Sequence, residues 1–172
     1  MKRTNREKDW PYVTALGARM IEMGDKRGWL HIYDENLLRR FGKATKQAAD
    51  FCQRRPVLRL AANHDPKLRT ALRAEIEYWH ELDRVRLSIY EKAVRRYIVE
   101  VRKSRLPPNA GLPDQHDLRV RCAEKHLPMN PLRDFGVGRM ISDAREALAQ
   151  TINPGAMEWL PDVREHFRLV TA

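Results

Sequence analysis

The chain has 172 residues, of which 42% are hydrophobic and 33% are charged, and its formal net charge is +10. Such a length is typical of one domain, and the basic excess indicates an anionic partner, either nucleic acid or an acidic protein. No run of about 18 apolar residues occurs, which excludes a membrane-spanning helix, and the N-terminus lacks the apolar segment of a secretory signal. We therefore expect a cytoplasmic protein without membrane contact.

The first 60 residues predict several short helices, because apolar residues recur there at steps of three and four. Asp9 and Pro11 suit the start of the first helix, and Gly24 suits its end. The apolar run at 29–33 fits one short strand or an extended segment. In chain order, the expected elements are a helix at 9–24, the segment at 29–33, and helices at 34–42 and 43–54, the last of which Pro56 ends.

The next element is the most strongly predicted one. Asp65 and Pro66 suit a helix N-terminus, and no further Gly or Pro occurs before Pro107. A helix of about 40 residues is about 60 Å long, which exceeds the diameter of a small domain. We therefore expect either a spine helix at about 65–105 or a kink near 83–88.

A turn-rich segment at 106–114 is the best internal boundary, since it contains three Pro and one Gly. Shorter helices are expected beyond it, at about 115–126, 138–151 and 156–169. The sequence thus predicts an all-α, irregular helical bundle around one long central helix, with at most one short strand near 29–33. Residues 1–105 form the core with the spine, 106–114 a linker, and 115–172 helices that pack on the same core.

Positive charge is densest at 39–59, where Asp50 is the single acid. Such an excess attracts polyanions, and it predicts a phosphate-binding face for RNA or DNA. A face that docks on an acidic protein, or one that only confers solubility, fits the same pattern. The candidate nucleic-acid-binding residues are Arg39, Arg40, Lys43, Lys46, Arg54, Arg55 and Arg59.

A second group of cations lies on the long helix. Arg84, Arg95 and Arg102 are separated by eleven and seven residues, which places them on one side of the helix. Glu77 and Glu91 fall on the same stripe, so we expect a solvated face of paired charges more than a nucleic-acid groove.

One spacing is compatible with catalysis. Arg121 and His126 form an Arg-x4-His pair, the signature of a family of small helical ribonucleases in which both side chains act on the scissile phosphate. An imidazole that titrates near neutrality suits general acid–base chemistry. Arg59 and His64 share the same spacing, however, and a chain rich in Arg produces such pairs by chance. The ribonuclease is therefore the alternative hypothesis.

Metal chemistry has little support in the sequence. Glu77 and His80 form a Glu-x-x-His pair, half of the ligand set of a carboxylate di-iron bundle, but no second such pair occurs. Cys52 and Cys122 cannot form a structural zinc site alone. We expect neither a metal nor another cofactor.

Residues 2–13 read Lys-Arg-Thr-Asn-Arg-Glu-Lys-Asp-Trp-Pro-Tyr-Val. They resemble the segment that follows the catalytic core in bacterial nucleotidyltransferase-like proteins of toxin–antitoxin and related systems. In that family the basic residues of this segment lie near the nucleotide site, which the resemblance maps onto Lys2, Arg6 and Lys8. The family's Gly-Ser motif and metal-binding Asp-x-Asp pair are missing here. The resemblance therefore implies the helical C-terminal portion, which does not transfer nucleotides by itself.

These observations favour a non-catalytic, basic, all-helical bacterial protein that binds a partner chain or nucleic acid. The alternative is a small ribonuclease that uses Arg121 and His126. The oligomeric state does not follow from the sequence.

Overall fold

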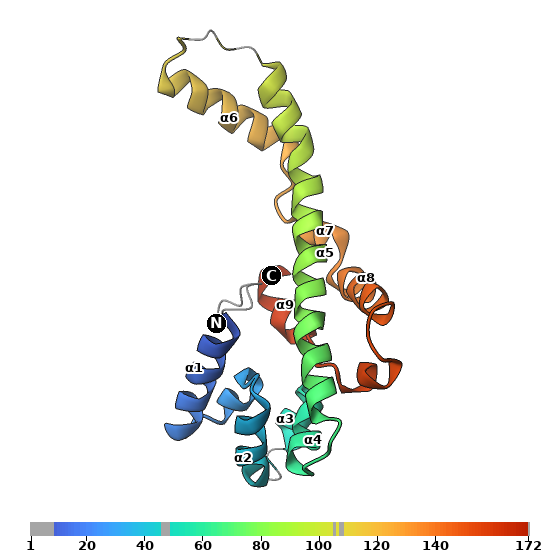
Figure 1. Cartoon of the computed structure of the whole chain (residues 1–172). Helices are drawn as coiled ribbons and strands as arrows, with labels where there is room; N and C mark the ends of the chain where they lie inside the picture. The colour runs from blue at the N-terminus through green and yellow to red at the C-terminus, as the bar shows by residue number, and fades with distance from the viewer. Residues whose placement is uncertain (1–8, 46–48, 105, 107–108, 172) are drawn as a thin grey trace.

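The computed structural model describes residues 9–45, 49–104, 106 and 109–171, and over these residues it consists of helices joined by turns (Figure 1). The predicted all-α fold is confirmed. The elements are, in chain order, α1 (Trp10–Glu22), the 3-10 helix η2 (Lys26–His31), α2 (Glu35–Thr45), α3 (Ala49–Arg54), α4 (Val57–Ala62), α5 (Leu68–Lys103), α6 (Leu112–His126), α7 (Pro131–Phe135), α8 (Val137–Ala149), the 3-10 helix η3 (Pro154–Trp159) and α9 (Arg164–Thr171).

The segment 29–33 is not a strand, and no strand occurs elsewhere in the part of the chain that the structure describes. Asp25 starts η2 instead, because its side chain accepts the N–H of Arg27 at 2.9 Å. η2 then packs closely on α1, and a Cβ added to Gly17 would lie 2.9 Å from the carbonyl oxygen of Gly28. Of the two alternatives for 29–33, the strand is not realised, because this turn and this close helix contact, rather than the apolar run, determine the local backbone.

The long helix is continuous. α5 contains 36 residues, and it is not interrupted near 83–88. The predicted cap Asp65 acts just before the helix begins, since its Oδ1 accepts the N–H of Lys67 at 2.8 Å. The spine predicted at about 65–105 is therefore confirmed, without the kink.

Two hydrophobic clusters pack along the first half of α5. The first joins α1–α4 and η2 to the N-terminal turns of α5, where Leu68 and Leu72 are buried. The second joins α7–α9 and η3 to the following turns through Tyr78, Leu82 and Ile89. We call these elements, together with residues 68–89 of α5, the body.

Beyond Ile89, α5 extends out of the body, and α6 folds back along it (Figure 1). We call residues 90–103 of α5 together with α6 the arm. α6 begins at Leu112, inside the segment predicted as a linker, and its buried side chain is Cys122. Helices α7–α9 pack on the body, whereas α6 packs on the protruding part of α5. The arm thus exposes two helices that the body does not cover.

Candidate functional site

Arg55, one of the predicted phosphate-binding residues, is buried. Its side chain is 2% exposed, and its Nε and Nη2 donate to the Glu75 carboxylate at 2.9–3.0 Å. Nη1 donates to the carbonyl oxygen of Trp29 at 2.8 Å, and the guanidinium lies 4.5 Å from the centre of the Tyr33 ring. The prediction that Arg55 contacts nucleic acid is therefore wrong, because this guanidinium joins η2 to α5 inside the body.

The carboxylate of Glu75 keeps the buried guanidinium of Arg55 charged. Burial alone lowers the pKa of Arg55, but the Glu75 carboxylate outweighs burial, and the net effect is a raised pKa. The Glu75 side chain is 1% exposed, so both charges have left water together. Both groups are therefore engaged with each other inside the fold.

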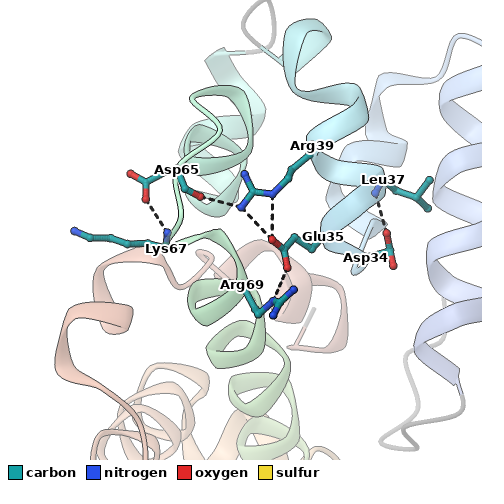
Figure 2. Close-up of polar contacts among 7 residues, drawn as sticks. All are labelled: Asp34, Glu35, Leu37, Arg39, Asp65, Lys67 and Arg69. Carbon is teal, nitrogen blue, oxygen red and sulfur yellow. Dashed lines mark hydrogen bonds and ion pairs between the residues drawn. The ribbon is translucent and has the colours of Figure 1, made fainter.

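Arg39 is also held within the fold (Figure 2). Its Nε donates to Glu35 at 3.1 Å, and its Nη2 donates to the carbonyl oxygen of Asp65 at 3.2 Å. Arg69 donates to the other oxygen of Glu35 at 2.8 Å, so one carboxylate joins α2 to α5. Hydrogen bonds from Arg69 and then Arg39 hold the pKa of Glu35 below its ordinary value. Arg39 therefore acts in the contact between α2 and α5.

The other predicted basic residues are placed as follows. Arg40, Arg54 and Arg59 are exposed, and Lys43 belongs to α2. Lys46 lies outside the described residues, as do the three residues that the family resemblance singled out, Lys2, Arg6 and Lys8. That resemblance stays a prediction. The 39–59 region thus retains three exposed arginines in the described part of the chain.

A pocket of about 240 Å³ lies in the body beside the buried pair. The lining combines arginines and histidines with carboxylates, so the charges offset one another and the pocket has no net attraction for an anion. It is lined by Arg27, Leu30, His31, Arg54, Arg55, Glu75, Trp79, Pro161, Asp162, Glu165 and His166. Over the described residues, no group of three or more His, Cys, Asp or Glu side chains is placed to hold a metal ion.

The two residues of the ribonuclease hypothesis do not converge. Both lie on α6, where a separation of five residues rotates the side chains about 140° apart. Arg121 is exposed and lines a cleft with Asp114 and Asp117. His126 lies near Glu100 of α5. α6 therefore does not present Arg121 and His126 to one phosphate.

The Glu77–His80 pair is part of a helix contact. The indole N–H of Trp10 donates to His80 Nε2 at 3.4 Å, and His80 Nδ1 lies 3.8 Å from Glu77. The rings of Trp10 and Tyr33 lie 4.4 Å apart. His80 thus helps to dock α1 on α5.

Most lysines and arginines of the arm form no ion pair with a described carboxylate. Glu100 pairs with Lys103 at 3.0 Å, but no carboxylate of a described residue pairs with the other lysines and arginines of the arm. These cations are Lys92, Arg95, Arg96, Arg102, Arg119, Arg121 and Lys125, and all are exposed. The expected pairing of Arg95 and Arg102 with neighbouring glutamates is therefore not made. Their charge is available to a partner.

Exposed apolar side chains accompany these cations. Among the described residues, the large exposed hydrophobic side chains fall mostly between 87 and 129, on the arm and at its base. Seven lie in that range, namely Leu87, Tyr90, Ile98, Val99, Leu112, Val120 and Met129, and three lie on or just after α1, namely Tyr12, Leu16 and Met23. The combination of unpaired cations and uncovered apolar surface makes the arm the best candidate for a binding surface. The sequence contained all these residues, but which of them the body would leave uncovered depends on the tertiary packing.

Comparison with known proteins adds no assignment. No family model matches the chain, and no match was found among curated proteins or solved structures. No helix that the structure describes is both long and apolar enough to cross a membrane.

Proposed function

We propose that this chain is a binding protein that holds an anionic macromolecule through its basic arm. The observation that carries the proposal is the set of seven exposed cations on the arm that form no ion pair with a described carboxylate. In the body, Arg39, Arg55 and Arg69 are each engaged by a carboxylate, and the exposed Arg54 and Arg59 form a smaller group. Exposed cations on a protruding element raise the local concentration of anions, and an anion can reach them without breaking an ion pair between described residues.

The shape of the arm supports the same function. α5 and α6 project from the body as two neighbouring helices, so a partner can reach both helices (Figure 1). The first half of α5 is anchored in the two hydrophobic clusters of the body. A rigid helix therefore presents the cations at fixed spacing, and little conformational entropy is lost on binding.

Salt-dependent binding to defined polyanions tests this proposal. Fluorescence anisotropy with labelled poly-L-glutamate and with a labelled single-stranded RNA measures affinity between about 50 and about 200 mM salt. We expect affinity to fall steeply with salt, because each ion pair that forms releases counterions.

Two variants of equal net charge locate the surface. The arm variant carries Arg95→Gln, Arg96→Gln and Arg102→Gln, and the control carries the same change at Arg19, Arg27 and Arg133, which are exposed arginines of the body that have carboxylate neighbours. Glutamine keeps a good helix propensity. We expect the arm variant to lose at least about tenfold in affinity and about two to three units of salt slope for RNA. Equal losses in both variants, or no binding of either polyanion at low salt, would refute the proposal.

A further inference from the structure

The apolar residues at the start of the arm form a seam along α5. Leu87, Tyr90, Val94, Tyr97 and Val101 follow one another at alternating steps of three and four. This spacing averages 3.5 residues, the repeat by which one helix packs along another. A second helix is therefore the element that fits the seam.

α6 occupies only one end of the seam. Val101 and Ser104 of α5 line a cleft with Leu118 and Arg119 of α6. Toward the body the seam is uncovered, since Leu87 is 52% exposed. Tyr90 and the adjoining Ile98 are each 37% exposed. We call the side of α5 that carries Leu87, Tyr90, Val94 and Ile98 the open face.

The open face is flanked by positive charge. Arg84, Arg95 and Arg102 lie within about 20° of one another around α5, next to Leu87 and Ile98, and the exposed Glu91 lies on the same stripe. Arg84 pairs with Glu81 at 2.7 Å, whereas no described carboxylate pairs with Arg95 or Arg102. The flank therefore keeps a net positive charge, with Arg95 and Arg102 outnumbering Glu91, and it complements carboxylates at the edge of a partner helix.

We infer that the open face binds an acidic amphipathic helix of a partner protein, an inference that rests on the proposed function of the arm. The apolar residues of that helix would cover Leu87, Tyr90 and Ile98, and its carboxylates would pair with the flanking arginines. A nucleic-acid backbone satisfies the arginines but leaves the aliphatic side chains in water. A second copy of this chain brings arginine flanks together, and such like-charge contacts oppose pairing.

Two labelled peptides of identical composition test the partner class. The first is a Glu-rich helix of about 20 residues with Leu at a repeat of 3.5. The second contains the same residues in an order that destroys the apolar stripe. We expect the first peptide to bind the full chain at least about tenfold more tightly, because only it covers the apolar seam.

Paired variants locate the contact. Leu87→Gln with Ile98→Gln alters the open face, and Leu112→Gln with Val120→Gln removes two exposed apolar side chains of α6 as a control. All four positions are exposed, so both variants keep the core. We expect the open-face variant to lose the preference for the striped peptide while it still binds poly-L-glutamate as the wild type does. The control should retain the preference.

The outcomes separate this inference from the proposed function. Equal binding of the two peptides, or an equal loss in both variants, overturns the inference while binding of polyanions persists. Failure of poly-L-glutamate, RNA and both peptides to bind refutes the proposed function itself. Self-association that light scattering detects, and that Leu87→Gln with Ile98→Gln abolishes, would identify a second copy as the occupant and would also overturn the inference.

Discussion

Replacement of Glu75 by glutamine should destabilise the protein strongly. The Glu75 carboxylate accepts three hydrogen-bond contacts from Arg55 at 2.9–3.0 Å, and the two side chains are 1% and 2% exposed. Glu75→Gln removes the negative charge and leaves the guanidinium buried without a counterion. Breaking a buried pair in this way costs about 3–5 kcal/mol.

This cost translates into a measurable thermal shift. In a chain of this length, 1 kcal/mol changes Tm by about 2–4 °C, so Glu75→Gln should lower Tm by roughly 6–20 °C. Circular dichroism during thermal and urea unfolding measures both Tm and the free energy of unfolding. Glu22→Gln is the matched control, because it breaks the exposed pair with Arg19 and should cost less than about 1 kcal/mol.

A double variant completes the test. Arg55→Met with Glu75→Leu removes both buried charges and should be more stable than Glu75→Gln, because hydrophobic replacement of a whole buried pair is often neutral. The reasoning fails if Glu75→Gln shifts Tm no more than Glu22→Gln does, since Arg55 would then not depend on its partner.

Two further predictions concern the body. Because Arg69 and Arg39 lower the pKa of Glu35 in the folded state, its contribution to stability is present above the unfolded pKa, which is about 4.3, and is lost as pH falls through the lower folded pKa. The free energy of unfolding should therefore fall less steeply in acid for Glu35→Gln than for the wild type. Urea titrations between pH 6 and pH 3 (about the range of carboxyl titration) measure this dependence on pH, and equal slopes for the two proteins would contradict the prediction. Gly28→Ala should destabilise the protein by about 1–3 kcal/mol or more, because the added Cβ collides with α1. The control Gly138→Ala on α8 meets nothing within 4 Å and should stabilise the protein by about 0.5–1 kcal/mol. Equal changes of Tm in the two variants would show that the contact between α1 and η2 is not tight.

The helical architecture followed from the sequence because it depends on local signals. Asp65 and Pro66 predicted the start of α5, and the absence of Gly and Pro predicted its length. The conformation of residues 29–33 could not be predicted from such local signals. Its apolar run is compatible with a strand or a helix, and the choice was made by the Asp25 turn and by the contact between Gly17 and Gly28.

The burial of Arg55 was missed, although the sequence contains a signal for it. Glu75 lies on the apolar side of α5, one turn after Leu72 and one turn before Tyr78. A buried carboxylate is usually paired with a cation, and the basic region at 39–59 is one source of such a cation from outside α5. Charge density alone does not separate a buried arginine from an exposed one, which is why the predicted patch contained both.

The arm was not predicted as a site because its exposure is a property of the whole fold. A helix longer than the body must protrude at one end, but only the packing of α7 to α9 on residues 78–89 determines which end that is. The cations at 95 and 102 were expected to pair with glutamates on their own helix. In the structure those pairs are not made, and the charge is left on the surface.

Hydrogen–deuterium exchange with bound poly-L-glutamate tests the central claim most directly. The measurement compares amide protection along the chain with and without the polyanion at low salt. We expect added protection in peptides that cover residues 90–126, and no change in α3 and α4, where the exposed Arg54 and Arg59 lie. Protection confined to α3 and α4, with no change in the arm, would contradict the account and would show that the binding site lies in the body.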